Sequence, residues 1–190
     1  MAQNGRSRWK IQIRHSKNTR PKLEVKPWGV LVTLPEGVGE EEAYRIIERH
    51  GRWIEARHAE LLEALERSRN VKLVRRSKAQ FRNLVKNLVE QITKEVLGMN
   101  PCKVVIREMK TRWASCSPKG TLTINALARY LPDHLITYII YHEICHIIEP
   151  KHNEVFRAYL QKYCPNYREF EKGLLVYEVK LGFHLSTETA

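Results

Sequence analysis

Apolar residues alternate with polar ones in two short segments near the start of the chain. Alternation with a period of two is typical of a strand that buries one of its faces. The alternating apolar residues are Trp9, Ile11, Ile13, Val30, Val32 and Leu34. Pro27 and Gly29 indicate a turn before the second segment. The pattern predicts short strands in a small antiparallel sheet.

A helical pattern follows in residues 40–65. The consecutive glutamates Glu40–Glu42 are typical of a first helical turn, because they face the partial positive charge there. Apolar residues then recur at helical spacing: Ala43, Ile46, Ile47, Trp53, Ile54, Leu61, Leu62 and Leu65. The pattern predicts one long helix that bends near Gly51.

A second helix is predicted from Ser77 onward. Gln80 lies three residues after Ser77, and this pair is typical of a capping box, in which each side chain binds the backbone N–H of the other residue. One face of the following segment is apolar, with Phe81, Leu84, Val85, Leu88, Ile92 and Val96. We expect this helix to end at Gly98.

The second half of the chain combines strands and helices. Residues 103–107 and 121–125 are rich in β-branched side chains and predict two strands. From Pro132 onward, apolar residues occupy nearly every side of a helical pattern, which is typical of a buried helix. Two shorter helices are expected after it, one capped by Asn153 and one over 165–181.

Together these elements predict an α+β fold with a small antiparallel or mixed sheet, a buried helix and further helices packed against it. The chain has 190 residues, and its hydrophobic and charged fractions of 43% and 28% are those of an ordinary globular protein. We expect a single domain over 1–190, with the first strands and the long helix in 1–70 and the other elements in 71–190.

The chain is strongly basic, with a formal net charge of +12. Residues 1–100 hold 21 Lys and Arg against 12 Asp and Glu, so most of the excess lies in the first half. Lys78, Arg82 and Lys86 form a stripe opposite the apolar face of the second helix. Such a stripe attracts polyanions and predicts weak nucleic-acid binding without sequence preference, although an ordinary solvated helix face is the alternative.

The sequence gives no sign of secretion or of a membrane span. The basic residues 1–15 contain no apolar segment of the kind found in signal peptides, and the apolar stretch 131–148 is interrupted by charged and polar residues. The four cysteines are widely spaced and form no Cys-x-x-Cys pair, so free thiols are expected. We therefore expect a cytoplasmic protein with no membrane partner.

The predicted buried helix contains a His-Glu-x-x-His sequence. His142 and His146 lie four residues apart, on one helix face and one turn from each other, so both can bind one ion. A catalytic zinc site uses three protein ligands and leaves a fourth position open for water. Pro150 should end the helix, and the chain can then fold back to present His152 as the third ligand.

Glu143 lies beside His142 on the helix, so its carboxylate should point toward the open position of the metal. There it could accept a proton from water, whose pKa a zinc ion lowers from about 15.7 to ~7. These residues predict a zinc-dependent peptidase with Glu143 as general base. Two alternatives remain: hydrogen-bonded core histidines, or a basic nucleic-acid-binding module with a structural zinc, in which Cys145 or Cys116 could be a fourth ligand.

The spacing of the three histidines equals that of the metzincin motif. That motif also has a glycine at its eighth position and a methionine turn downstream. Here Glu149 occupies the glycine position, and every methionine of the chain lies upstream of the histidines. The sequence therefore excludes a metzincin.

The segment Thr111–Ser117, followed by Asn125, resembles the segment that precedes the zinc helix in the YgjP-like metallopeptidases, a zincin family. Ala114 departs from this pattern, because the family usually has glycine there. Further similarities lie at Trp53 and in 156–167, so the resemblance extends over nearly the whole chain. A more distant resemblance is to the SprT-like proteases, which adds a protease acting on DNA-bound proteins as an alternative function.

The resemblance implies a zincin-like α+β fold, a three-histidine zinc site and a peptide or protein substrate bound as an added strand along the sheet edge beside the metal. We expect 121–125 to be this edge strand. The substrate-binding residues predicted on this basis are Trp113, Ser115, Thr121, Thr123 and Asn125. Core packing is an equal alternative for Trp113. Arg112 and Tyr167 are hypotheses for stabilising the oxyanion.

Overall fold

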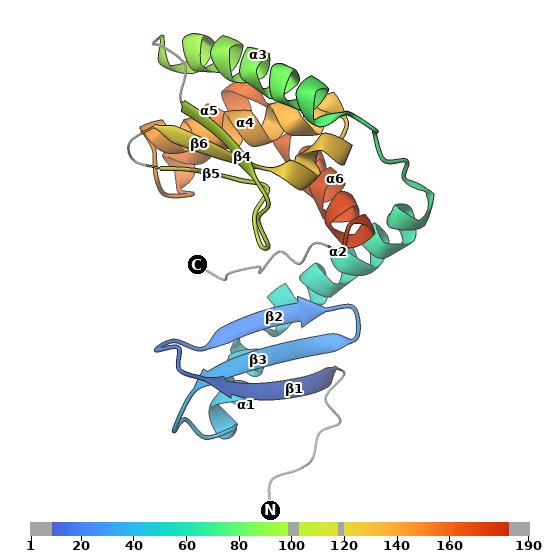
Figure 1. Cartoon of the computed structure of the whole chain (residues 1–190). Helices are drawn as coiled ribbons and strands as arrows, with labels where there is room; N and C mark the ends of the chain where they lie inside the picture. Colours follow the sequence, from blue (N-terminus) through green and yellow to red (C-terminus); the bar gives the residue numbers. More distant parts are fainter. Residues whose placement is uncertain (1–8, 99–102, 118–119, 183–190) are drawn as a thin grey trace, which may run out of the picture. The chain divides into compact units, whose positions relative to one another are not determined.

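A computed structural model describes residues 9–98, 103–117 and 120–182 of the chain (Figure 1). The chain divides into two compact units, the first up to residue 66 and the second from residue 67 onward. Each unit has its own hydrophobic core and its own small sheet with helices, so the predicted α+β class is confirmed. The division does not test whether 1–190 is a single domain, and that expectation stays a prediction.

The first unit is built on a three-stranded sheet. Its strands are β1 (Lys10–Ser16), β2 (Lys22–Lys26) and β3 (Gly29–Pro35), in the order β1-β3-β2. The central strand β3 pairs antiparallel with β2 and parallel with β1. The antiparallel expectation is therefore wrong for β1 and β3, because the tight turn at 27–28 joins β2 to β3 while β1 reaches β3 from its other side.

Two helices contribute to the core of the first unit. In place of the one long helix predicted, the structure has two, α1 (Glu41–Arg49) and α2 (Gly51–Asn70), which are separated at His50, close to the predicted bend at Gly51. The fully buried core residues include Val30, Val32, Leu34, Ala43 and Ile54. The alternation in β3 thus buries one face of the sheet against the helices.

The second unit contains a sheet of β4 (Lys103–Arg107), β5 (Ala114–Cys116) and β6 (Thr121–Asn125), in the order β4-β6-β5. The predicted strands 103–107 and 121–125 are confirmed with the same bounds, while β5 was not predicted. β6 pairs parallel with β4 and antiparallel with β5. The expectation that 121–125 is an edge strand is wrong, because both sides of its backbone are already paired.

The second unit also contains several helices. They are α3 (Lys78–Leu97), the 3-10 helix η1 (Ala126–Tyr130), α4 (Asp133–Ile148), α5 (Glu154–Tyr163) and α6 (Tyr167–Lys180). The predicted capping box of Ser77 and Gln80 is present at the start of α3, and Gly98 ends this helix in the left-handed region. None of the helices in the described part of the chain is long and apolar enough to cross a membrane.

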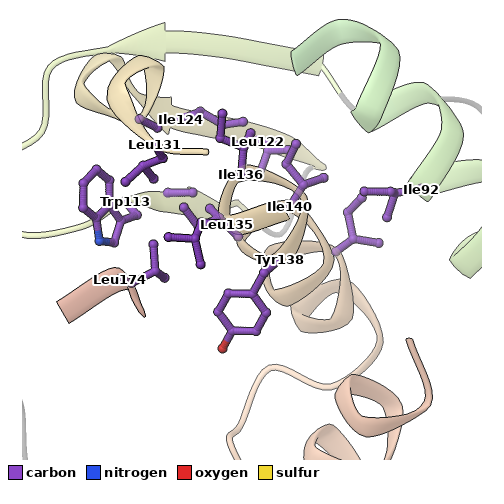
Figure 2. Packing of buried hydrophobic residues seen from close by; sticks show 14 of the residues in the cluster. Ile92, Trp113, Leu122, Ile124, Leu131, Leu135, Ile136, Tyr138, Ile140 and Leu174 are labelled. Carbon is purple, nitrogen blue, oxygen red and sulfur yellow. The ribbon is translucent and has the colours of Figure 1, made fainter. Parts of the chain in front are cut away.

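Helix α4 forms the centre of the second core (Figure 2). It contacts β5, α3, α5 and α6, and its residues Ile136, Ile140 and Ile144 are fully buried. Leu122 and Ile124 of β6 face the same core. The predicted buried helix is thereby confirmed, and its position between sheet and helices fixes the side chains that it presents.

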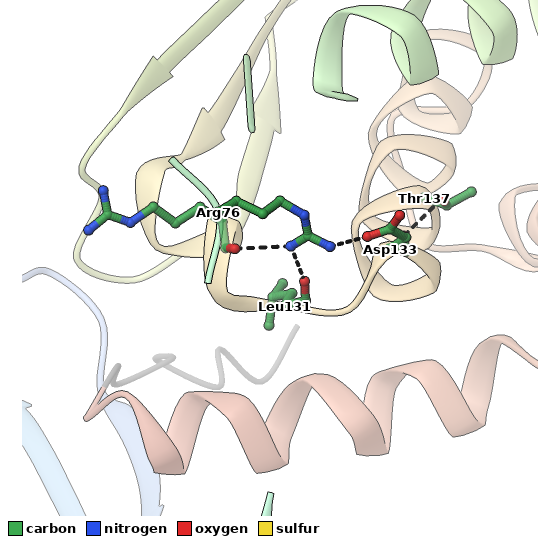
Figure 3. Close-up of polar contacts among 5 residues, drawn as sticks. Arg76, Leu131, Asp133 and Thr137 are labelled. Carbon is green, nitrogen blue, oxygen red and sulfur yellow. Dashed lines mark hydrogen bonds and ion pairs between the residues drawn. The ribbon is translucent and has the colours of Figure 1, made fainter. Parts of the chain in front are cut away.

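The 71–77 segment has no helix or strand but is fixed to the second unit (Figure 3). Val74 donates its backbone N–H to the carbonyl of Tyr130 at 3.0 Å. Arg76 Nη1 donates to the carbonyls of Arg129 and Leu131 at 3.0 and 2.6 Å. Its Nη2 also makes an ion pair with Asp133, the first residue of α4. Arg76 therefore holds the chain at the entry to α4.

Candidate metal centre

Three histidines come together at the end of α4. His142 and His146 are on α4, and His152 lies in the return between α4 and α5. One ring nitrogen of each histidine lies within 4.8 Å of those of the other two. The Nε2 atoms of His142 and His152 are 3.2 Å apart. Two nitrogens bound to one tetrahedral zinc ion would be about 3.3 Å apart, so this donor set fits such an ion.

The segment 149–153, which connects α4 to α5 and contains His152, is fixed by its own hydrogen bonds. The backbone N–H of Lys151 donates to Glu149 Oε1 at 3.0 Å, which lowers the pKa of the Glu149 carboxyl. Asn153 Oδ1 accepts from the N–H of Phe156 at 3.0 Å and caps α5, as predicted. Pro150 follows the last residues of α4 and stops the helix. His152 is thus held between a helix end and a helix start.

Hydrogen bonds set which ring nitrogen of each helical histidine is free. His146 Nδ1 lies 3.2 Å from the carbonyl of Glu149, which can only accept, so Nδ1 carries the hydrogen. The hydroxyl of Tyr138 donates to Glu171 Oε1 at 3.2 Å, so its oxygen can accept from His142 Nδ1 at 3.4 Å. Both histidines therefore present an unprotonated Nε2, as metal-ligating histidines commonly do.

Phe156 forms an apolar floor under the three imidazoles. Its ring centroid lies 5.0 Å from that of His142, 4.4 Å from His146 and 4.8 Å from His152, and the side chain is 2% exposed. Burial, aided by repulsion from the other two rings, lowers the pKa of His142 to about 3. Burial also lowers the pKa of His146 and His152. Neutral imidazoles keep the lone pairs that a metal needs.

Glu143 connects α4 to β5. Its carboxylate accepts a hydrogen bond from the backbone N–H of Cys116. Burial raises the pKa of Glu143 to about 7, against the opposing effects of this hydrogen bond and of the Arg112 charge. A general base works best when its pKa lies near the operating pH. Without a metal, burial therefore makes this carboxylate more basic than an ordinary glutamate, and it lies beside the three histidines.

The hydrogen bonds of β5 show which of its residues face β6. The carbonyl of Trp113 accepts from the N–H of Asn125 at 2.8 Å, and Ser117 donates its N–H to the carbonyl of Thr121 at 3.0 Å. In an antiparallel pair, alternate residues direct their backbone groups toward the partner strand. Residues 113, 115 and 117 therefore face β6.

The residues between them face the open side of β5. Ala114 and Cys116 direct their N–H and C=O groups away from β6, and within the described ranges no further strand pairs with β5. The N–H of Cys116 reaches Glu143 on this side. The open edge beside the metal centre is therefore β5, in place of the predicted 121–125.

The predicted substrate-binding residues fall into different places. Trp113 is 5% exposed, and its indole Nε1 donates to Glu178 Oε1 at 2.9 Å inside the core, which favours the packing alternative. Thr121 and Thr123 are half-buried on the central strand β6. Ser115 lies on β5, the strand with the open edge. Its backbone groups face β6, and substrate binding by Ser115 stays a prediction.

Asn125 is fully buried, and its side chain is committed to the protein itself. Its Nδ2 donates to the carbonyls of Met109 and Arg112 at 2.8 and 2.9 Å. Its Oδ1 accepts from the N–H groups of Leu127 and Met109 at 3.1 and 3.4 Å. An amide has two donors and two acceptor positions, and all are used. Asn125 orders the turns around β6, and no hydrogen-bonding capacity remains for a substrate.

Arg112 and Tyr167, the two residues suggested to stabilise an oxyanion, have different surroundings in the structure. Arg112 is exposed, and its charge acts on Glu143. Tyr167 is 9% exposed, and its hydroxyl accepts from Arg168 Nε at 3.4 Å. Stabilisation of an oxyanion stays a hypothesis for both residues, and the position of Arg112 near the carboxylate makes it the stronger of the two.

Sequence reasoning missed three residues of the centre. Tyr138 lies four residues before His142, so its place on the same helix face could have been inferred. Glu171 comes from α6 and reaches Tyr138 only through the tertiary fold. Phe156 reads as an ordinary core residue of α5 until the three rings around it are known. Nothing in the local pattern indicates the last two.

The basic stripe of α3 is solvent-exposed. Lys78, Arg82 and Lys86 all lie on the exposed side of the helix. The opposite face buries Phe81, Val85 and Val89. The exposure of these three residues agrees with the predicted polar face of the helix. It does not test whether this face binds nucleic acid or is only solvated.

A model of the YgjP-like metallopeptidase domain matches residues 62–176, more than half of the chain. The chain belongs to the YgjP-like metallopeptidase family. The match spans the three histidines, Glu143 and β5, and it confirms the resemblance stated above. As a metallopeptidase, this YgjP-like chain acts on peptide or protein substrates and uses a metal ion.

Two solved structures are similar to the YgjP-like chain. The zymogen of Pyrococcus abyssi abylysin, a metallopeptidase, is 30% identical, with 53% of this chain and 98% of that one covered and a TM-score of 0.46. The zymogen of Methanocaldococcus jannaschii jannalysin, also a metallopeptidase, is 27% identical, with 48% and 93% covered and a TM-score of 0.44. No curated protein matches the sequence significantly.

Proposed function

We propose that the protein is a zinc-dependent metallopeptidase that hydrolyses peptide bonds with Glu143 as general base. The supporting observation is the 3.2 Å separation of the Nε2 atoms of His142 and His152, with His146 on the same helix face as His142. When bound by these three residues, a zinc ion supplies Lewis-acid chemistry and lowers the pKa of water from about 15.7 to ~7.

In this proposal, Glu143 moves the proton. Its carboxylate accepts a proton from the attacking water and returns it to the amine that leaves. Burial raises the pKa of this carboxyl in the metal-free protein, which makes it a stronger base than an ordinary glutamate. The hydrogen bond from Cys116 restricts the carboxylate before the reaction, so little reorganisation is needed.

The substrate is bound along the open edge of β5. An extended peptide can add to this edge as a further strand, with main-chain hydrogen bonds to Ala114 and to the carbonyl of Cys116, whose N–H is donated to Glu143. Such bonds do not depend on the substrate side chains, so the edge itself gives broad specificity. Because Cys116 also contacts Glu143, a peptide on this edge lies next to the general base.

A structural zinc site is the competing interpretation, and it requires a fourth protein ligand. Among the described residues, the group of possible metal ligands consists of His142, His146 and His152, without a fourth. Burial raises the pKa of the Cys145 thiol to about 11, which disfavours the thiolate that would bind a metal. Cys116 directs its Sγ toward the carbonyl of Ser117 at 3.6 Å. These observations favour an open, catalytic site.

The test uses two substitutions in the same helix. Glu143→Gln keeps the size of the side chain but removes its basicity, so hydrolysis of an unfolded protein should fall by about 10²- to 10⁴-fold while zinc remains bound. His146→Ala removes a ligand and should lose the zinc as well. Zinc content by elemental analysis and cleavage rates are measured on the same samples. A Glu143→Gln variant that retains zinc and cleaves as fast as wild type would contradict the proposed mechanism.

Nucleic-acid binding on α3 is a second candidate, favoured by the exposure of Lys78, Arg82 and Lys86. Phosphate contacts release counterions, so this binding should weaken steeply as salt rises and should show no sequence preference. Changing the three residues together to Glu should abolish it. Unchanged retention of that variant on a DNA column would remove this candidate and, with it, the alternative of a protease directed to DNA-bound proteins by this helix.

A further inference from the structure

One face of the first sheet is polar and basic. On β1, Lys10, Gln12 and Arg14 are exposed, while Ile11 and Ile13 between them are half-buried and Ile13 packs against the core of the first unit. The strand register places Gly29 of β3 between Lys10 and Lys26, and Thr33 of β3 between Arg14 and Lys22. We call this face, formed by the residues in register with Lys10, Gln12 and Arg14, the outer face. Cations therefore flank its central strand on both sides.

The positive charge of the outer face is only partly compensated. Residues 9–35 contain six Lys and Arg and one acidic residue, Glu24. Glu24 lies 3.7 Å from Lys22 Nζ and 3.0 Å from Lys26 Nζ, so it is occupied by the two cations of β2. On β1, neither Lys10 nor Arg14 has an ion-pair partner within the described residues. The β1 side of the outer face thus carries two free cations.

Trp28 adds an exposed aromatic ring to the same side. It lies in the turn between β2 and β3, and 43% of it is exposed. The next residue, Gly29, has a φ of 144° and lies so close to β1 that a Cβ would be 2.1 Å from the carbonyl oxygen of Lys10. This contact fixes the turn beside β1. A shallow open depression of about 560 Å³ is lined by Lys10, Ile11, Gln12, Arg14 and Trp28.

We propose that this depression binds single-stranded nucleic acid, with a base stacked on Trp28 and phosphates at Lys10 and Arg14. Non-specific binding of single strands combines a basic groove with aromatic side chains on which bases stack. Lys10 and Arg14 are four residues apart on a strand, or roughly 13 Å, so they follow the direction of an extended chain rather than forming one anion site. The proposal involves the first unit alone and is independent of the peptidase mechanism.

A duplex and an acidic peptide fit these residues less well. Bases in a duplex are already stacked on each other, so the ring of Trp28 would have no free base face to contact. An acidic peptide could pair with Lys10 and Arg14 but would leave the indole ring exposed. The proposal therefore expects a single strand to bind more tightly than a duplex of the same sequence, and more tightly than poly-glutamate.

The first test concerns the ring. Binding of the full chain to a labelled oligo-dT of about a dozen nucleotides, within the usual site size of single-strand binders, is measured by fluorescence anisotropy. Trp28→Ala should weaken binding roughly 5- to 150-fold, as the loss of one stacked base does. Tyr44→Ala is the matched control, because Tyr44 is an aromatic residue of α1 with 54% exposure, and it should bind as wild type. Equal affinities of Trp28→Ala and wild type would overturn the proposal.

The second test concerns the charges. Lys10→Glu with Arg14→Glu should abolish binding, whereas Arg49→Glu with Arg52→Glu changes the net charge equally on exposed helical positions and should have little effect. The milder pair Lys10→Gln with Arg14→Gln should reduce the dependence of affinity on salt, with folding checked by circular dichroism. Equal losses in the two charge-reversed pairs would overturn the proposal in favour of general charge attraction. Equal competition by duplex or by poly-glutamate would also overturn it.

The third test separates this depression from α3. If nucleic acid binds at the first sheet, the variant with Lys78, Arg82 and Lys86 changed to Glu should retain most of its preference for single strands. Loss of that preference in the α3 variant, with full retention in the Lys10 and Arg14 variant, would place the binding on α3 and refute the proposed site.

Discussion

The two sheets of the molecule share one topology but differ in what lies beside their edges. In each, the third strand is central, pairs parallel with the first and antiparallel with the second. In the first unit, the depression beside the edge strand β1 is lined by Lys10, Arg14 and the Trp28 ring. In the second unit, the edge strand β5 contacts Glu143 of α4, which follows His142 of the histidine cluster in the sequence.

This difference shows that strand order alone does not determine function. A sheet edge offers the same unpaired N–H and C=O groups wherever it occurs. In the proposed function, the second sheet becomes a peptidase site because α4 places imidazoles and a carboxylate next to that edge. Within the described residues of the first unit no comparable cluster of metal ligands occurs, and exposed cations take its place.

The largest effect should come from breaking the first sheet at Gly29. Gly29→Ala would force a Cβ against the carbonyl of Lys10 in a backbone conformation that favours glycine, and we expect a loss of about 3 kcal/mol or more in the stability of the first unit. Gly37→Ala is the matched control, because Gly37 has a φ of 83° but no atom within 4 Å of the added Cβ. Thermal unfolding of both variants is followed together with zinc content.

We expect zinc binding to survive Gly29→Ala at low temperature, since the three histidines all belong to the second unit. Loss of zinc in parallel with the melting of the first sheet would mean that 1–190 folds as one cooperative domain, and the comparison between two separate sheets would then fail.

The next effect should come from the hydrogen bond behind His142. Tyr138→Phe removes the acceptor for His142 Nδ1, and loss of such a partner commonly costs about 10- to 100-fold in metal affinity. Tyr141→Phe is the control, because Tyr141 is on the same helix and its hydroxyl donates to Glu95 at 2.7 Å instead. Zinc affinity is measured by competition with a chelator. Equal affinities in the two variants would show that Tyr138 does not orient the ligand.

The open edge of β5 can be tested at Ala114. Ala114→Pro removes an N–H that points away from β6, so it should leave the β5–β6 pairing intact. One main-chain hydrogen bond to the substrate would be lost, and KM for an unfolded protein should rise about tenfold. Ala114→Gly keeps the N–H and should change KM little. If proline leaves KM unchanged while the protein stays folded, the substrate does not pair with β5.

The last effect concerns pH and the metal-free protein. The pKa of His142 is about 3 in the folded state against 6.5 for an ordinary histidine, so between these values the unfolded chain binds more protons. This contribution to stability is complete above about pH 6.5 and is lost as the pH falls toward 3. Tm without metal should therefore fall more on acidification in wild type than in His142→Gln. Parallel Tm curves would show that His142 does not remain neutral.

Where a signal is local, the sequence was sufficient to predict the structure. The start of α3 follows from Ser77 and Gln80, and the end of α4 follows from Pro150, because a cap or a proline acts on the neighbouring backbone. The spacing of His142 and His146 is likewise fixed by one helix. The return of His152 to them was predictable because only five residues separate it from His146.

Pairing between distant segments was not predictable in the same way. The pattern of 121–125 is the same for a central strand as for an edge strand, and β5 has only three residues, too few for a recognisable alternation. Asn125 has the composition of a binding residue, yet its four hydrogen-bonding positions are used by turns that exist only in the folded chain. The contact of Glu171 with Tyr138 depends on the docking of α6.

The 71–77 segment bears on how fast copies of this protein would cleave one another at high protein concentration. A peptidase that binds extended backbones can cleave irregular segments of a neighbouring copy. The 71–77 segment has no helix or strand and contains two arginines. The bonds of Val74 and Arg76 to residues 129–133 withhold that backbone from another molecule's open edge. On the proposed function, we expect Arg76→Ala to release this stretch and to make it the first point of autolysis.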